Sequence, residues 1–141
     1  MSFLLDTYVL SEASKPQPDR SVKAWLDNVD EDRLFVSAIS LAGIRFGIER
    51  LAPGTRRSDL ERWFNEGLTE RLGSRLLVVD SSVANEWGTI QAQCQARGRR
   101  MNVMDCFLVA TSRVHQLTMV TRNTDHFSDA GCELFNPWTA E

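Results

Sequence analysis

Short apolar runs alternate along this chain with longer stretches in which polar and apolar residues are mixed. Short apolar runs that end at a polar residue are typical of buried strands. They lie at residues 3–5, 33–37, 75–79 and 117–120, with a shorter candidate at Leu134 and Phe135. Strands that alternate with helices favour parallel β-α-β units. The pattern therefore predicts one α/β domain over residues 1–141, with three layers, in which helices flank a central, mostly parallel sheet of four to five strands.

Apolar side chains repeat at helical spacing between these runs. The clearest repeat follows Ser40, which is the expected N-cap of a helix over 40–51. Another long repeat begins after Ser58, and a late one begins at Asp105, which is again expected to be an N-cap. The full set of predicted helices covers residues 9–14, a segment that opens at 18 or 19 and ends at 28, and residues 40–51, 58–72, 83–94 and 105–115.

The composition is that of an ordinary globular protein, with 43% hydrophobic and 25% charged residues. The apolar runs are too short to cross a bilayer, and the N-terminus lacks the basic segment of a secretory signal. We therefore expect a cytoplasmic protein without membrane contacts. The net charge of −3 means that any site for nucleic acid must be local. The candidate patches are Arg97, Arg99 and Arg100, and the pair Arg56 and Arg57, although solvated loop charges explain them equally well.

The cysteines and histidines give no sign of a zinc site or a disulfide framework. Cys94, Cys106 and Cys132 form no C-x-x-C pair and are odd in number, so we expect reduced thiols. His115 and His126 lack ligand-type spacing to any cysteine. We interpret His115 as a residue on a helix surface or half-buried, and His126 as a loop residue.

Three aspartates stand where strands end or helices begin. Asp6 follows the first strand, Asp105 opens a late helix, and Asp125 follows the strand at 117–120. The carboxyl ends of parallel strands share one edge of a sheet, so these acids can converge there. Converging carboxylates repel each other unless a cation offsets their charge, and Mg²⁺ or Mn²⁺ prefers such oxygen ligands. Each aspartate also has a simpler explanation, because Asp is favoured at N-caps and in turns.

Several segments together resemble the PIN-domain ribonuclease toxins of the VapC type, in their FitB-like branch. Residues 4–12 read LLDTYVLSE and are similar to the family's opening LLDTNVLSE, and residues 37–48 read SAISLAGIRFGI, similar to SAITLAEIRxGI. Residues 104–111 read MDCFLVAT and resemble xDALIAAT, while residues 120–124 read VTRNT as in the family. The FNPW segment at 135–138 resembles the tail of that branch. These segments follow the family's order along nearly the whole chain.

The resemblance implies a metal-dependent endoribonuclease toxin of a type II toxin-antitoxin system, with Mg²⁺ or Mn²⁺ as the cofactor and RNA as the substrate. It also implies a VapB-type antitoxin as partner, a homodimer, and contact with DNA only through the antitoxin. Asp6 and Asp105 match the first and third acids of the family motif. Asn123 occupies the asparagine of the TRN segment, and Asp125 lies one residue before the fourth acid position. The implied metal ligands are therefore Asp6, Asp105 and Asp125.

The chain departs from the family pattern at three positions around this site. Gly43 stands where the family has glutamate, Tyr8 where it has asparagine, and His126 where it has the aspartate before phenylalanine. Losing a carboxylate should weaken metal binding and misplace the attacking water, so we expect weak activity at most. Glu12 or Asp125 is the candidate to replace the missing ligand.

Two other functions are weighed against a ribonuclease. A non-catalytic PIN module that acts by binding an antitoxin or another protein would explain the residues at Gly43 and Tyr8. A phosphoacceptor receiver domain also places acids at strand ends, but this chain lacks the paired acids after the first strand and the lysine after a late strand.

Overall fold

The computed structural model describes residues 1–139 and has a five-stranded, wholly parallel sheet in the order β3-β2-β1-β4-β5. The strands are β1 (Phe3–Leu5), β2 (Leu34–Ser37), β3 (Leu76–Leu77), β4 (Thr118–Val120) and β5 (Leu134–Phe135). The α-helices are α1 (Thr7–Ala13), α2 (Arg20–Asn28), α3 (Ala38–Glu49), α4 (Thr55–Arg62), α5 (Thr69–Leu72), α6 (Ser81–Ala96) and α7 (Val103–His115). Short helical segments lie at Glu31–Arg33, Gly73–Arg75 and Thr124–Phe127, and a π-helical segment, Trp63–Leu68, joins α4 to α5. This architecture confirms the predicted α/β class.

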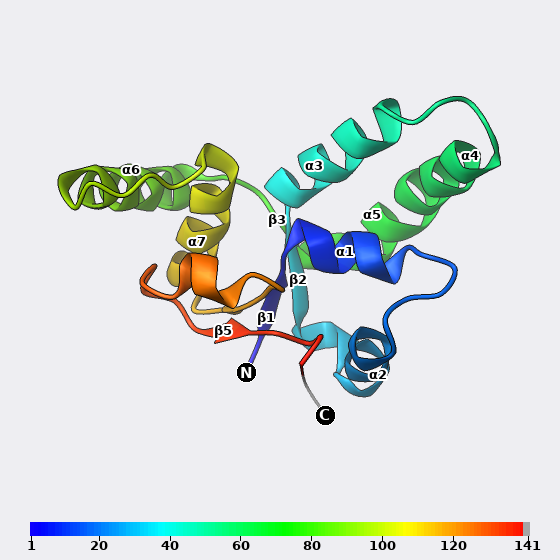
Figure 1. Ribbon diagram of the computed structural model, residues 1–141, viewed down its shortest axis with the longest axis horizontal. Helices are drawn as coiled ribbons and strands as arrows, with labels where there is room; N and C mark the ends of the chain where they lie inside the picture. The colour runs from blue at the N-terminus through cyan, green and yellow to red at the C-terminus, as the bar shows by residue number, and fades with distance from the viewer. Residues whose placement is uncertain (140–141) are drawn as a thin grey trace.

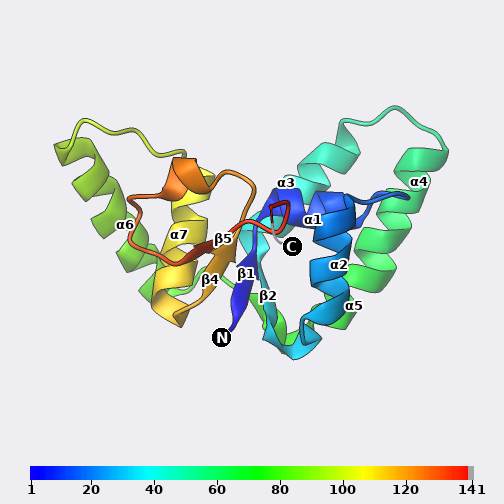
Figure 2. The same ribbon diagram turned by 60° about the horizontal axis from the view of Figure 1, so that its bottom comes forward.

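The sheet separates two layers of helices (Figure 1, Figure 2). Helices α6 and α7 lie on one side, and α1 to α5 lie on the other. Side chains alternate between the two faces of a strand, so Leu4 packs into the core beneath α6 and α7, whereas Leu5 packs into the core beneath α1 and α3. Met119 and Val120 divide in the same way. The strands are buried on both faces, which explains their continuous apolar runs.

The strand order fixes the place of a functional cleft. The chain moves outward from β1 through β2 to β3, and then returns to the other side of β1 to form β4 and β5. The crevice at such a reversal opens at the carboxyl ends of the two strands beside it. In this protein those strands are β1 and β4, which pair in register from Phe3 with Thr118 to Leu5 with Val120.

Two predicted helix caps are wrong. The N-cap of α3 is Ser37, whose hydroxyl accepts the amide of Ile39, because β2 passes into the helix without a loop. Ser40 is instead buried inside α3 and accepts a hydrogen bond of 3.2 Å from the Thr7 hydroxyl. The N-cap of α7 is Asn102, whose side chain accepts the amide of Met104 at 2.8 Å. Asp105 therefore lies in the first turn of the helix, where it remains free for another role.

Two element boundaries also differ from the predictions. The helix expected from Ser58 begins at Thr55, directly after Gly54. The strand expected over 75–79 is shortened to Leu76–Leu77, because β2 ends at Ser37 and offers no partner further along. Val78 and Val79 are consequently exposed. None of the helices in residues 1–139 has the length and apolarity needed to cross a membrane.

The central strand should dominate the stability of the fold. Leu4 is completely buried in β1, and we expect Leu4→Ala to lower the free energy of unfolding by about 2–5 kcal/mol, through lost burial and the cavity that remains. Val78→Ala is the matched control, because this side chain is 63% exposed and its loss should cost under about 0.5 kcal/mol. Urea unfolding followed by circular dichroism measures both. Equal costs for the two variants would contradict this account of the core.

Candidate active site

Asp6 is a buried acid at the point where β1 passes into α1. It is the N-cap residue of α1, with extended backbone angles, and its amide donates to the Val120 carbonyl at 3.0 Å. Its side chain is held by the Thr121 hydroxyl, which donates to Oδ2 at 2.8 Å. The oxygen of that hydroxyl accepts the amide of Asn123 at 3.2 Å, and this leaves its proton directed at Asp6. The carboxylate is thus placed by β1 and β4 together.

The environment of Asp6 disfavours its charged form. The residue is only 5% exposed, and burial raises the pKa of its carboxyl above the ordinary value. The hydrogen bond from Thr121 opposes this rise, and the neighbouring charge of Asp105 adds to it. Burial is thus the main reason that the pKa of Asp6 is raised, and the charge of Asp105 is a smaller one.

Asp105 faces the same space from the first turn of α7. Its Oδ2 lies 3.1 Å from Nε2 of His126, so the imidazole and the carboxylate hold each other in position. His126 belongs to the segment Thr124–Phe127, which is anchored in the core by the buried Phe127. The rings of His126 and Phe127 pack edge to face with centroids 4.8 Å apart. The sequence prediction of a plain loop residue missed this contact, and the only available signal was that His126 occupies an acid position of the family pattern.

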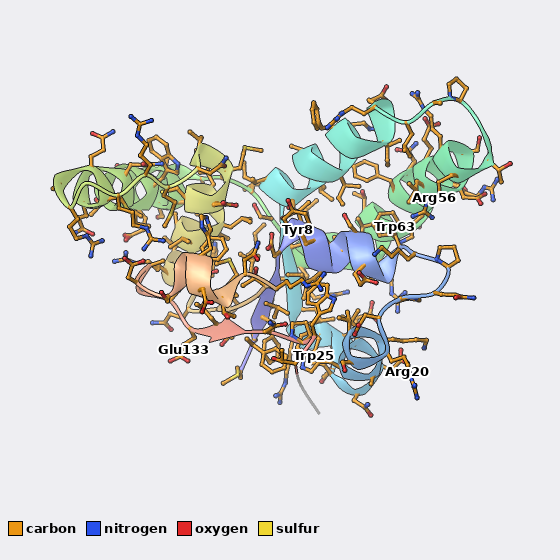
Figure 3. All side chains as sticks on the ribbon, in the orientation of Figure 1. Tyr8, Arg20, Trp25, Arg56, Trp63 and Glu133 are labelled. Atoms are coloured by element: carbon orange, nitrogen blue, oxygen red, sulfur yellow. The ribbon has the colours of Figure 1, made fainter. Side chains whose placement is uncertain are left out.

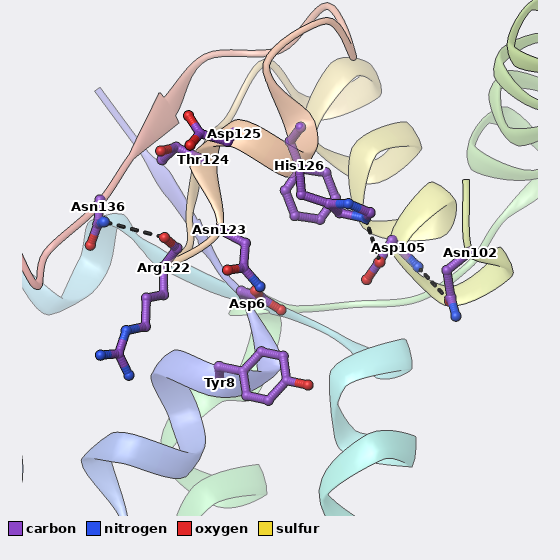
Figure 4. A pocket seen from close by; sticks show the side chains of 11 residues that line it. Asp6, Tyr8, Asn102, Asp105, Arg122, Asn123, Thr124, Asp125, His126 and Asn136 are labelled. Atoms are coloured by element: carbon purple, nitrogen blue, oxygen red, sulfur yellow. Dashed lines mark hydrogen bonds and ion pairs between the residues drawn. The ribbon is translucent and has the colours of Figure 1, made fainter. Parts of the chain in front are cut away.

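A pocket of about 770 Å³ surrounds these acids at the carboxyl ends of β1 and β4. Figure 4 shows Asp6 at its centre, Asp105 and His126 on one side, and Arg122 on the other. The residues that line the pocket are mostly polar: Asp6, Tyr8, Asn102, Asp105, Arg122, Asn123, Thr124, Asp125, His126, Phe127 and Asn136. The structure therefore gathers all the predicted site residues at one place.

Asp125 is the exception in orientation. It lines the rim of the pocket, but its side chain points away from Asp6 and Asp105 (Figure 4). Within residues 1–139, no three acidic, histidine or cysteine side chains are grouped closely enough to hold one ion. The donors that do converge are two carboxylates, with the Asn123 amide in the same pocket. Mg²⁺ needs only one or two protein carboxylates and keeps several waters, so this oxygen-rich set fits such an ion.

The second acid of the family pattern, which Gly43 lacks, has no replacement from α1 or α3. Glu12 is buried, but its two oxygens accept hydrogen bonds of 2.9 Å from the Lys15 ammonium and the Asp19 amide. It does not line the pocket. A Cβ atom at Gly43 would lie 3.2 Å from Cγ2 of Thr7, a tight contact that requires Thr7 to shift by a few tenths of an ångström. The local packing around Gly43 is thus adapted to a residue without a side chain.

The predicted basic patches are only partly available to a ligand. Arg99 pairs with Asp129 and donates to the carbonyl of His126, and Arg57 bridges Glu49 and Glu61. Both arginines therefore act in part as structural links. Arg56, Arg97 and Arg100 make no ion pair within the part of the chain that the structure describes.

The cysteines lie away from this pocket and are unpaired, as predicted. Burial raises the pKa of Cys106 and of Cys132 to about 11, so both thiols stay protonated at neutral pH.

Comparison with known proteins agrees with the fold and with the motifs. The PIN domain family matches residues 3–131. The chain is 34% identical to Toxin FitB of Neisseria gonorrhoeae, across 96% of this chain and 97% of that protein. It is 33% identical to the VapC ribonuclease Y4jK of Sinorhizobium fredii, across 96% of each chain.

Among solved structures, FitAB bound to an IR36 DNA fragment contains a chain that superposes with a TM-score of 0.90. That chain is 33% identical, and the match covers 99% of this protein and 97% of that chain. The match runs through all five strands and through the segments that supply Asp6 and Asp105. This chain therefore belongs to the PIN-domain family, together with Toxin FitB and the VapC ribonuclease Y4jK.

Proposed function

We propose that this protein is a divalent-metal-dependent endoribonuclease of a type II toxin-antitoxin system, weakened by the loss of one carboxylate. The observation that carries the proposal is the pair Asp6 and Asp105, which face one polar pocket in a relative of a named toxin and a named ribonuclease. A carboxylate whose charged form is disfavoured by burial, and further by a second acid, is suited to binding a cation.

In this proposal Asp6 and Asp105 hold Mg²⁺ or Mn²⁺, and the amide of Asn123 orients a water or a phosphate beside them. When bound, the ion offsets the charge of an RNA phosphodiester and activates water for attack on it. Thr121 fixes the rotamer of Asp6 by donating to Oδ2, and His126 fixes Asp105 through Nε2. Hydrogen bonds of this kind to ligand carboxylates set their direction and basicity.

A non-catalytic PIN module remains the second candidate, and Gly43 is the observation that favours it. The pocket lacks a carboxylate from α3, and the contact between position 43 and Thr7 disfavours adding one. Such a module would still bind a partner but would not cleave RNA. Metal-dependent cleavage of RNA by the parent chain separates the two candidates.

Gly43→Glu should raise RNA cleavage and Mg²⁺ affinity, provided that Thr7 makes room. We therefore expect the clearest gain in Gly43→Glu combined with Thr7→Ser, because serine lacks Cγ2 and keeps the hydroxyl that bonds Ser40. Correct placement of the water can be worth about 100-fold in rate. The measurements are cleavage of a labelled RNA and calorimetric titration of Mg²⁺.

Gly43→Ala with Thr7→Ser is the control for packing, and it should leave the cleavage rate unchanged. Asp105→Ala in the restored protein should abolish the gain. If the restored protein neither cleaves RNA nor binds Mg²⁺ more tightly, the non-catalytic module is the better description.

The raised pKa of Asp6 makes stability depend on pH and on metal. The pKa of the Asp6 carboxyl is higher in the folded protein than in the unfolded chain. The folded state therefore binds this proton more tightly, which stabilises the protein at pH values below the unfolded pKa. That stabilisation is lost as the pH rises through the folded pKa. Asp6→Asn removes the charge and keeps an oxygen that can accept from Thr121. Without metal at pH 7.5, we therefore expect the Tm of Asp6→Asn to be higher than that of the parent chain.

With Mg²⁺ present, the parent chain should become more stable than Asp6→Asn. Mg²⁺ is expected to raise the Tm of the parent chain by mass action and to have little effect on Asp6→Asn. Differential scanning fluorimetry with and without MgCl₂, at pH 4.5 and 7.5, measures both effects. An Asp6→Asn protein that is less stable than the parent at pH 7.5 without metal would contradict the assigned electrostatics.

The proposed partner is a small VapB-type antitoxin, with a homodimer of the toxin as its usual form and with DNA contacted only through the antitoxin. A groove of about 440 Å³ supports this proposal. It lies between α2 and the segments that follow α4, with apolar walls that include Leu10, Leu26, Trp63 and Leu68. The walls of the groove include residues of α2 but none of α3.

Leu26→Glu should abolish co-purification with a coexpressed antitoxin, because a charge in an apolar groove must be desolvated on binding. Thr89→Glu, at an exposed site on α6, is the control and should co-purify normally. Retention of the antitoxin by Leu26→Glu would move the interface elsewhere.

A further inference from the structure

Tyr8 is an exposed aromatic residue that does not contribute to the hydrophobic core of the fold. It is 65% exposed, although it stands in α1 only two residues after the buried Asp6. Its ring makes no aromatic pair and its hydroxyl makes no hydrogen bond within residues 1–139. Yet the side chain, which lies at the start of α1 (Figure 3), lines the pocket of the two acids (Figure 4). Packing therefore does not explain an aromatic ring at this position.

Arg122 provides a cation on the same pocket. It is exposed and forms no ion pair with any carboxylate of the described residues. Its guanidinium lies over the ring of Trp138, 5.2 Å from the centroid, and this contact limits its freedom. The N–H groups at the edge of the guanidinium remain available, because a stacked guanidinium can still donate in its own plane.

Asn136 makes this arrangement rigid. Its side-chain Nδ2 donates to the Arg122 carbonyl at 3.2 Å, and its Oδ1 accepts the amide of Trp138 at 2.9 Å. One side chain thus fixes the backbone of the arginine and the backbone of the residue on which it stacks. The cation is positioned before any ligand arrives, which lowers the entropy cost of binding.

We propose that Tyr8 and Arg122 form a nucleotide subsite beside the acid pair, in which the ring of Tyr8 stacks on an unpaired RNA base and Arg122 contacts the adjoining phosphate. This inference rests on the proposed function and names how the same pocket holds its substrate. Proteins bind single-stranded nucleic acid by this combination of an aromatic face and a positioned cation. A subsite of two residues also explains how a chain with a net charge of −3 binds RNA locally.

The subsite should prefer single-stranded RNA to duplex RNA. An aromatic face can stack only on a base that has left its helix, so the pocket selects single strands and loops over duplexes. The carboxylates lie at the centre of the pocket and Arg122 to one side, so the stacked nucleotide flanks the phosphate nearest the acids (Figure 4). Tyr8 and Arg122 are positioning residues in this proposal, and neither takes part in proton transfer.

The test measures binding of a fluorescein-labelled single-stranded RNA hexamer by anisotropy, in EDTA so that cleavage does not interfere. Tyr8→Ala should weaken binding by about 5- to 100-fold, the usual value of one base stack. Tyr8→Phe keeps the ring and should stay within about 2-fold of the parent. Phe46→Ala removes another exposed aromatic, 63% exposed on α3 and outside the pocket, and should change nothing.

Two further measurements identify the contacts. In a set of hexamers that each lack one base at a different position, one hexamer should bind equally well to the parent and to Tyr8→Ala. In that hexamer the base that stacks on Tyr8 is already missing. Arg122→Gln should reduce the slope of log affinity against log salt by about 0.7, the value for one phosphate contact on a single strand. A duplex of the same sequence should bind equally to the parent and to Tyr8→Ala.

The outcomes separate this inference from the proposed function. If Tyr8→Ala binds the hexamer as well as the parent, or more tightly because the ring obstructs the pocket, the subsite is refuted even if RNA is cleaved. If binding depends on Tyr8 as described but no cleavage occurs with Mg²⁺ or Mn²⁺, including in the restored Gly43→Glu protein, the subsite stands and the ribonuclease proposal fails.

Discussion

The hydrogen bond from the Thr121 hydroxyl to Asp6 joins two strand ends that are 115 residues apart in the chain. It exists because β1 pairs in register with β4, which brings the residue after each strand to the same edge of the sheet. The same pairing turns the chain from β4 into the Arg122 to Phe127 segment, which supplies the opposite wall of the pocket. The geometry of the acids, the amide of Asn123 and the contact of His126 with Asp105 all depend on this one junction.

That junction also shows how the fold tolerates an unfavourable charge. A buried carboxylate loses hydration, and one hydroxyl donor compensates for only part of the loss, so the pKa of Asp6 remains raised. The two apolar cores on either side of the sheet supply the stability that makes such a site possible. Strain of this kind is common where a protein is arranged to bind a ligand rather than to maximise stability.

The three departures from the family pattern have different structural consequences, and two of them, Tyr8 and His126, line this pocket. Gly43 removes a carboxylate from α3, and its neighbour Thr7 fills part of the space that a side chain would need. His126 replaces an acid with an imidazole that holds Asp105 in place. Tyr8 adds an exposed aromatic ring to the wall of the pocket. The pocket therefore holds two converging carboxylates, an imidazole in contact with one of them, and an exposed ring that lines the same pocket as an arginine stacked on Trp138.

The sequence by itself determined the class of fold, because strand and helix periods differ and can be read from local apolar spacing. The ends of local elements pointed to Asp6 and Asp105, and the family resemblance pointed to Asn123; all three line the same pocket. Only the tertiary structure decided that Asn102 caps α7, that Asp125 turns outward and that Glu12 is engaged by Lys15 and the Asp19 amide. It alone brought Arg122, Asn136 and Trp138 together. These features depend on contacts between separate segments and on side-chain rotamers, and local spacing carries no information about either.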